Sequence, residues 1–370
     1  MYKKLLIVTM LFVLVFSSMS LAADYKDEYT LSYNVGPSFP WGIGANYFAD
    51  LVKERTDGRI NIKPYGGSSL ASGKQTSIFM MVRNGSVDMA MESTINWSSQ
   101  IKELNLFNLP FFFDGYKEVD AVENGEAGQQ ILDKIERFGV VPIGWGENGF
   151  RQITNNKRAV HSPEDLSDLK YRVVGSKIFI DIFKELGSNP LTMNWGEATT
   201  GFQQGTVDGQ ENPTVGVLIP LKIWDFHEYM TVWDYLVDPL LLGINEDVFN
   251  SWTEEDQKIV RKAAKEALKF EKMLSRYNLD DGTAKQYVDK MIESGEDMGY
   301  AKDFLATWEQ EDGSNDPLEY LEEQGMKVNV LTDEEKEAFI EKTRDVHDEW
   351  VKTIGEDLVE KAKSDMESVE

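Results

Sequence analysis

Residues 170–213, KYRVVGSKIFIDIFKELGSNPLTMNWGEATTGFQQGTVDGQENP, contain the clearest fold signal in this chain. It begins with an apolar strand, Lys170–Val174, followed by a helix over Lys177–Leu186 that Gly187 ends. A second helix over Trp195–Gln204 ends at Gly205 in the same way. This alternation of short strands and amphipathic helices predicts an α/β unit with a mostly parallel sheet.

The same alternation opens the chain. Three strands are predicted, at Tyr29–Asn34, Ile60–Tyr65 and Val87–Met91, with helices over the apolar positions from Ile43 to Val52 and over Gln75–Arg83. A helix from about Tyr116 to Phe138 is predicted to lead into a strand at Val140–Trp145. Because two such α/β units follow each other, and because 370 residues exceed one ordinary domain, we expect two lobes.

Two helix starts in the last third of the chain have a capping Thr followed by acids. The first, Trp252–Asp256, begins a helix that we expect to run to about Asp280 and to brace both lobes. The second, Leu331–Glu335, begins a helix reaching toward Trp350, and a polar helix follows over residues 356–367. We expect lobe I to comprise residues 24–148 and about 236–279, lobe II residues 149–235 and about 280–345, and residues 346–370 to form a C-terminal helix.

Residues 1–23 have the pattern of a secretory signal peptide. Lys3 and Lys4 precede an apolar run, Leu5–Phe16, which small residues follow up to Ala23. We expect cleavage after Ala22 or Ala23 and export to the periplasm, since no second segment of about 18 apolar residues follows. The chain has no Cys, which excludes a lipid anchor on an N-terminal Cys and a disulfide framework.

The charge balance is strongly acidic. The chain has 38 basic and 64 acidic residues, a net charge of −26, and loss of the two lysines of the signal peptide makes it −28. This balance disfavours nucleic acid as a partner and is typical of a highly soluble surface. A local pair of arginines can still reverse the potential inside a cleft.

Templates of the common enzyme classes are absent from the sequence. There is no Gly-x-Ser-x-Gly, no His-Glu-x-x-His and no phosphate-binding Gly-rich loop. The three histidines, His161, His227 and His347, are scattered, and none lies at metal-ligand spacing from another. We therefore expect a protein that is not an enzyme and has neither a cofactor nor a bound metal. A secreted two-carboxylate hydrolase is the enzymatic alternative.

Three segments place unusual side chains at strand ends: Gly149–Thr154, Lys170–Val174 and Gly205–Pro213. Together with Trp195-Gly196-Glu197 they resemble the DctP-type substrate-binding proteins of TRAP transporters, over about residues 29–267. The most specific match is QQGTVDGQENP at 203–213, and weaker ones are RNGSVDM at 83–89 and LPF at 109–111. The chain departs from the family pattern at residues 173–175, where many members have a Pro, and over residues 297–323, which are longer than expected.

The resemblance implies binding roles for three polar residues. It places Arg172 at the family's carboxylate-binding arginine and Arg151 at a second basic position, which adds charge or holds the carboxylate from another side. A guanidinium can hold a carboxylate through two parallel, charge-assisted hydrogen bonds, so the chemistry agrees with this role. Asn212 offers a donor and an acceptor at the end of a strand. The structural alternatives are a surface arginine for Arg172, an ion pair for Arg151 and a plain turn residue for Asn212.

Aromatic and acidic side chains supply the remaining candidates. Trp195, at a helix start inside the matched motif, is interpreted as a pocket-lining ring. Pocket lining and core packing both remain open for Phe39, Trp233, Trp41 and Trp97, of which the first two are counted as ligand-binding candidates. Ligand contact and a solvated loop position both remain open for Glu92, Asp234 and Asn34.

These observations predict a two-lobed α/β fold of the periplasmic-binding-protein type, with mixed sheets flanked by helices and a long bracing helix. The ligand cleft is expected between the lobes, at the carboxyl ends of the strands. We expect a monomer that closes by a hinge motion on a small organic acid. The resemblance implies delivery of that acid to a small DctQ-like and a large DctM-like membrane subunit. A sugar acid, an aromatic or indole acid, a dicarboxylate and an ectoine-like cyclic solute all remain open. A binding lobe of a sensory system is the alternative of a different class.

Overall fold

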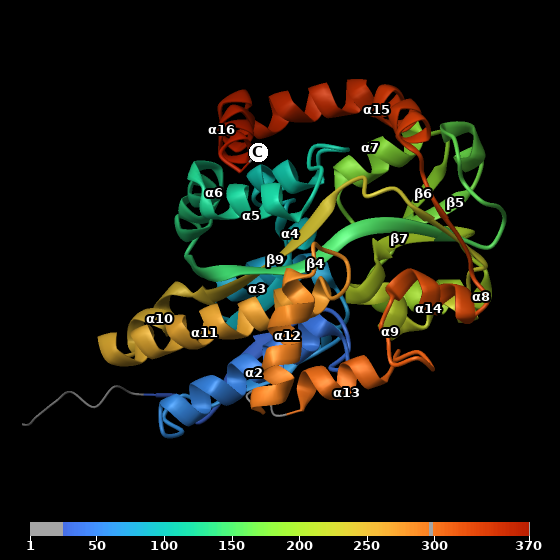
Figure 1. The fold of residues 1–370 in the computed structure, drawn as a ribbon. Coiled ribbons are helices and arrows are strands. Elements are labelled where there is room, and N and C mark those ends of the chain that lie inside the picture. The colour runs from blue at the N-terminus through green and yellow to red at the C-terminus, as the bar shows by residue number, and fades with distance from the viewer. Residues whose placement is uncertain (1–24, 296–298, 370) are drawn as a thin grey trace, which may run out of the picture.

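The computed structural model describes residues 25–295 and 299–369. The predicted signal peptide, residues 1–23, lies outside the described residues. The described chain forms two lobes, each a β-sheet flanked by helices, which confirms the predicted α/β fold with mixed sheets (Figure 1). Within the described residues, no helix is both long enough and apolar enough to cross a membrane.

The sheet of the first lobe has the strand order β2–β1–β3–β9–β4. Its strands are β1 (Tyr29–Ser32), β2 (Ile62–Tyr65), β3 (Met89–Ser93), β4 (Val140–Asn155) and β9 (Val237–Asn245). β1 pairs in parallel with β2 and β3, as the alternating pattern predicts. β9 lies antiparallel between β3 and β4, a pairing that the sequence pattern does not indicate.

The sheet of the second lobe has the order β10–β8–β4–β7–β5–β6. Its further strands are β5 (Lys170–Val173), β6 (Asn189–Thr192), β7 (Gly209–Pro213), β8 (Tyr229–Val232) and β10 (Lys327–Val330). β5 pairs in parallel with β6 and β7, whereas β4 is antiparallel to β7 and β8. Both sheets are therefore mixed.

Strand β4 belongs to both sheets. Residues from Val140 to Phe150 pair with β9, and residues from Arg151 to Asn155 pair with β7. The pairing with β9 shifts register between Glu147 and Gly149, and Gly149 has a φ of +118°, which a residue with a Cβ rarely adopts. A bulge bends and twists a strand, so this point turns the chain from one lobe into the other.

Helices cover both sheets. Those of the first lobe include α2 (Pro40–Arg55), α3 (Ile78–Arg83), α4 (Thr94–Trp97), α5 (Tyr116–Asn124), α6 (Glu126–Glu136), α10 (Glu246–Ser251) and α11 (Glu254–Ser275). Those of the second include α7 (Lys177–Glu185), α8 (Trp195–Gln204), α9 (Ile219–Leu221) and α14 (Pro317–Glu323). The single helix predicted from about Tyr116 to Phe138 is two helices, because Gly125 between them has an extended backbone.

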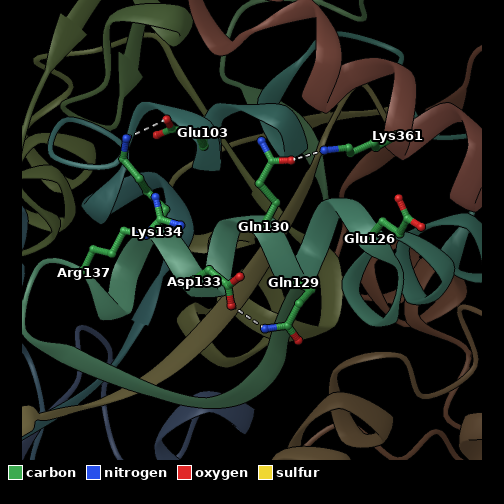
Figure 2. A pocket seen from close by; sticks show the side chains of 8 residues that line it. All are labelled: Glu103, Glu126, Gln129, Gln130, Asp133, Lys134, Arg137 and Lys361. Atoms are coloured by element: carbon green, nitrogen blue, oxygen red, sulfur yellow. Dashed lines mark hydrogen bonds and ion pairs between the residues drawn. The ribbon is translucent and has the colours of Figure 1, made fainter.

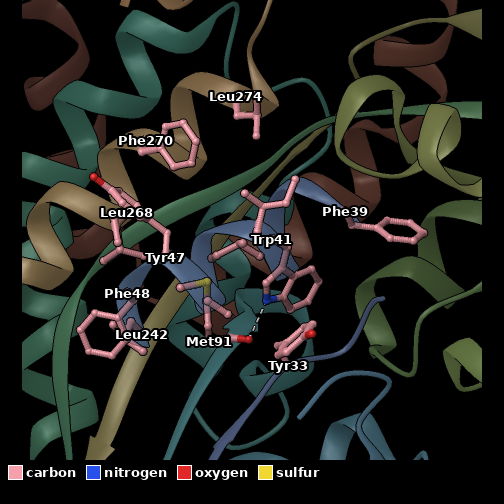
Figure 3. Packing of buried hydrophobic residues seen from close by; sticks show 14 of the residues in the cluster. Tyr33, Phe39, Trp41, Tyr47, Phe48, Met91, Leu242, Leu268, Phe270 and Leu274 are labelled. Carbon is pink, nitrogen blue, oxygen red and sulfur yellow. Dashed lines mark hydrogen bonds between the residues drawn. The ribbon is translucent and has the colours of Figure 1, made fainter. Parts of the chain in front are cut away.

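The core of the first lobe lies where α2 and α11 pack on each other and on the sheet (Figure 3). The indole Nε1 of Trp41 donates to the carbonyl oxygen of Met91 on β3, at 2.7 Å. A Cβ on Gly44 of α2 would lie 2.5 Å from the side chain of Glu271 on α11. Glycine at this position therefore allows the two helices their close approach.

The long helix that touches both lobes is α15 (Asp333–Ile354). It contacts α7 of the second lobe and, in the first lobe, η3 (Lys102–Asn108) and α16 (Glu356–Glu367), and it runs across the top of the molecule in Figure 1. The bracing role predicted for the helix that starts at Thr253 does not hold, because α11 ends at Ser275 and packs on α2 and β4.

The chain after α11 divides differently from the expected boundary at about residue 280. α12 (Thr283–Ser294) packs against α11, and the hydroxyl of Tyr300, the first residue of α13 (Tyr300–Ala306), donates to Asp50 of α2 at 2.8 Å. Both helices thus lie on the first lobe, whereas α14 and β10 lie on the second. Apolar periodicity marks these helices but does not say which lobe they cover.

Candidate functional site

A narrow polar cavity lies between the lobes, where strands of both sheets end. The first lobe contributes Asn34, Val35, Trp41, Gln75, Ser93, Asn96, Asn148 and Asp238. The second lobe contributes Arg151, Arg172, Val174, Trp195, Asn212 and Val217. The free volume is about 20 Å³, room for one or two water molecules, so the lobes stand close together. Among the predicted site residues, Arg172, Arg151, Asn212, Trp195 and Asn34 are brought together here.

Arg172, at the end of β5, is a buried cation. Its side chain is 1% exposed, and its Nε and Nη2 donate to the carbonyl oxygen of Met193 at 3.2 and 2.8 Å. The guanidinium carbon lies 5.8 Å from the ring centroid of Trp195. No carboxylate within the described part of the chain forms an ion pair with Arg172.

Arg151, in the middle of β4, is equally buried but fully paired. Its guanidinium binds the carboxylate of Glu211 through two nitrogens and that of Asp238 at 2.8 Å. It also donates to the backbone oxygen of Glu211 at 2.7 Å and to Oδ1 of Asn212 at 3.0 Å. These contacts form the ion pair that the sequence left as the alternative for Arg151, while the residue also lines the cavity.

The two arginines therefore have opposite electrostatic environments. Burial, together with the positive charge of Arg151, lowers the pKa of Arg172 to about 10, although Glu211 acts in the other direction. Burial alone would lower the pKa of Arg151 as well, but its ion pairs with Glu211 and Asp238 raise that pKa above the ordinary value for arginine. Arg172 is thus the cation whose charge the surrounding protein leaves least compensated.

A chain of side-chain amides crosses the cavity from one lobe to the other. On β3, Glu92 accepts from Nδ2 of Asn96 at 2.8 Å, and Oδ1 of Asn96 accepts from Nε2 of Gln75 at 2.8 Å. Oε1 of Gln75 then accepts the backbone N–H of Trp195, the first residue of α8, at 2.8 Å. Because Nδ2 of Asn96 donates to Glu92, the orientation of each amide along the chain follows in turn.

A second contact between the lobes lies beside this chain. The hydroxyl groups of Ser98 and Ser176 are 3.1 Å apart. Ser98 follows α4 of the first lobe, and Ser176 caps α7 of the second. The conformation is therefore a closed one.

Four of the predicted site residues do not line the cavity. Trp233 is 2% exposed and packs on Tyr235, with ring centroids 4.3 Å apart. Phe39 ends the segment before α2, and its ring lies at the margin of the first core (Figure 3). Asp234 accepts from Gln152, and burial raises its pKa. Glu92 is fully buried, which raises its pKa well above the usual range, and it reaches the cavity only through Asn96.

The two other rings considered from the sequence take different places. Trp41 lines the cavity, whereas Trp97 is completely buried against Phe79. Sequence reasoning missed Gln75, Asn96, Asn148 and Asp238, all of which line the cavity. Asp238-Pro239 interrupts an apolar strand and Asn96 follows another, and a polar residue at such a position is the one signal that could have pointed to them.

A wider recess elsewhere on the surface is less suited to a ligand. It lies between η3, α6 and α16, and the side chains that line it are all polar (Figure 2). Most of them bind each other: Lys134 pairs with Glu103, Gln129 donates to Asp133 and Lys361 donates to Gln130. No predicted site residue lies there.

Residues 31–311 match the family model described as bacterial extracellular solute-binding protein, family 7. The chain is similar to a TRAP periplasmic solute-binding protein of Ralstonia eutropha, solved with bound (S)-2-acetolactate. The two share 42% sequence identity and a TM-score of 0.81, and the match covers 93% of this chain and 100% of the other.

Two further relatives extend the comparison. The 2,3-diketo-L-gulonate-binding periplasmic protein of Escherichia coli is 30% identical over 259 residues, which are 70% of this chain and 77% of that protein. An uncharacterised protein of Sinorhizobium fredii is 32% identical over 248 residues, which are 66% of this chain but 45% of that longer protein.

Proposed function

Because the chain belongs to family 7 of the bacterial extracellular solute-binding proteins, we propose that it captures a small organic acid between its lobes and clamps the carboxylate with Arg172. The relatives with named functions are solute-binding proteins, which bind their ligands without converting them. The two named ligands, (S)-2-acetolactate and 2,3-diketo-L-gulonate, are both small organic acids.

The observation that carries this proposal is the buried charge of Arg172. A cation removed from water is costly unless an anion pairs with it. Arg172 lines the cavity at 1% exposure, and its two nitrogen contacts are to a neutral carbonyl oxygen. A ligand carboxylate would supply the missing counter-charge, held by the planar fork that only arginine presents.

Closure would follow from the hinge at Gly149 and the contacts between the lobes. Opening the cleft breaks the Gln75–Trp195 and Ser98–Ser176 hydrogen bonds between polar groups of the two lobes. A ligand that touches both lobes adds contacts available only in the closed form, and it shifts the population toward that form.

Delivery to a TRAP-type membrane transporter completes the proposal. Members of this family act in the periplasm, and the similar Ralstonia protein is a TRAP solute-binding protein. We propose that the exported chain begins at Ala23 or Asp24, that it acts as a monomer, and that its closed form is what a small and a large membrane subunit recognise. N-terminal sequencing of exported protein tests the first point, and a product that retains Met1 would contradict it.

The test of function is calorimetry with a panel of organic acids chosen by thermal shift. One-to-one binding at micromolar affinity, about −8 kcal/mol, is expected, with no product formed. Arg172→Ala should weaken binding by about 2–5 kcal/mol, roughly thirtyfold to several thousandfold. Arg172→Lys should be nearly as harmful, because a point charge cannot replace the fork.

The matched control is Arg344→Ala, at an exposed arginine of α15. It should bind as the unchanged protein does. Chemical conversion of an acid by the purified protein would contradict a pure binding role. Micromolar binding that survives in Arg172→Ala would remove this residue from the site.

A further inference from the structure

We propose that the cavity selects small monocarboxylates that carry a hydroxyl group and rejects dicarboxylates. This inference rests on the proposed role of Arg172. It adds a charge rule, namely that the cavity accepts one ligand carboxylate and excludes a second. It follows from how the cations and anions around the cavity are already paired.

Arg172 and Arg151 are the only cations among the described residues that line the cavity. Arg151 is engaged by Glu211, Asp238 and Asn212, which together accept from its Nε, Nη1 and Nη2 atoms. Arg172 has no acidic partner in the described chain. One guanidinium is therefore free to bind one carboxylate.

The wall around Arg151 is acidic. Asp238 lines the cavity at 1% exposure, and Glu211 lies behind Arg151 at 0% exposure. Two cations thus face two buried anions before any ligand is bound. A second ligand carboxylate would lose its water, meet no free cation and face Asp238, and like charges in a desolvated site repel strongly.

Asn148 adds a requirement for a hydrogen-bond donor. Its Nδ2 donates to Asp238 at 2.8 Å, which leaves Oδ1 as the acceptor of the amide, close to Gly216, where an added Cβ would lie 2.7 Å from it. This oxygen is buried and has no hydrogen-bond partner among the described residues, and Asn148 lines the cavity. A ligand hydroxyl can donate to it, whereas a carboxylate cannot.

Part of the remaining lining is aliphatic. Val35, Val174 and Val217 present aliphatic surface to the cavity. Neutral alkyl groups therefore suit the part of the ligand that points away from Arg172.

Calorimetry on the full-length mature protein tests the rule with three matched pairs of acids. They are 2-hydroxybutanoate and malate, 2-hydroxypentanoate and 2-hydroxyglutarate, and 2-hydroxy-2-methylbutanoate and 2-hydroxy-2-methylsuccinate. Within each pair one terminal methyl becomes a carboxylate. At least one monocarboxylate should bind, and at least tenfold more tightly than its partner. Replacing its hydroxyl by a methyl, as in 2,2-dimethylbutanoate for the third pair, should weaken binding about tenfold.

Asp238→Asn removes one negative charge with little change of shape, and it should narrow the gap within a pair. Equal or tighter binding of a dicarboxylate by the unchanged protein would overturn the charge rule while leaving the clamp by Arg172 intact. Absence of binding for all six acids would also overturn it. The proposed function itself would fail only if the wider panel of acids gave no binding that depends on Arg172.

Discussion

Replacing Arg172 by methionine should abolish acid binding without destabilising the protein. Methionine keeps an unbranched side chain of about the length of the arginine stem and removes the guanidinium with its buried charge. A pKa of about 10, below the usual value for arginine, corresponds to about 3 kcal/mol of unfavourable free energy for holding the charged form in the fold. Loss of the hydrogen bonds to Met193 lowers the free energy of unfolding by about 1–2 kcal/mol. The free energy of unfolding of the ligand-free protein should therefore rise by about 1 kcal/mol.

Arg151→Met is the matched control, because both arginines are 1% exposed. Arg151 pairs with Glu211 and Asp238, so its removal leaves two buried carboxylates without their cation. Breaking a buried pair in this way costs about 3–5 kcal/mol. The two substitutions, chemically identical, should thus change stability in opposite directions.

Urea unfolding followed by circular dichroism and by tryptophan fluorescence measures both effects. A ligand at a hundred times its dissociation constant should stabilise the unchanged protein by about 2.7 kcal/mol and Arg172→Met not at all. If Arg172→Met lost as much stability as Arg151→Met, Arg172 would be a structural residue, and the argument from its uncompensated charge would be refuted.

Three further outcomes are expected. Gln75→Ala removes the acceptor of the Trp195 N–H and should destabilise the closed form by about 1 kcal/mol, so calorimetry should show a fall in ligand affinity of about fivefold. Unchanged affinity would show that this hydrogen bond does not contribute to closure. Gly216→Ala would place a Cβ 2.2 Å from a backbone oxygen of β4 and should lower the unfolding free energy by about 2 kcal/mol, whereas Gly196→Ala, with nothing within 4 Å, should not. Burial lowers the pKa of His227 to about 4, so His227 takes up a proton in the unfolded chain at a higher pH than in the folded protein. About 3 kcal/mol of the free energy of unfolding should therefore be lost as the pH falls from 6.5 to 4, and the urea midpoints of His227→Gln should not show this loss.

Local patterns predicted the elements of the fold better than their pairing. The strand at Lys170 and the helices from Lys177 and Trp195 lie where their apolar spacing and terminal glycines place them. The 16-residue length of β4 was not predicted, because Pro142 and the glycines of its first half interrupt any alternating pattern. What keeps that segment extended is its partner β9, nearly a hundred residues later, and pairing over such a separation leaves no local signature.

The candidate site divides in the same way. Arg172, Arg151 and Asn212 end or interrupt strands inside a specific motif, and the structure brings them to one cavity; their contact with a ligand stays a prediction. Gln75 lies in a short turn without a motif, and only the approach of α8 from the other lobe gives it a role. Trp233 is the opposite case: the sequence made it a candidate for the cleft, but its ring is buried among other aromatic rings.

The sharing of β4 limits how this protein can be divided or recombined. In the first sheet its early half is an edge strand, but in the second sheet its later half lies between β7 and β8. A cut near Phe150 would separate β1, β2, β3 and the early half of β4 from β9, which lies between β3 and β4, and the unpaired strand edges would invite aggregation. Neither lobe is therefore a module that can be expressed alone, and a chimera that exchanges lobes between relatives must inherit β4 whole from one parent.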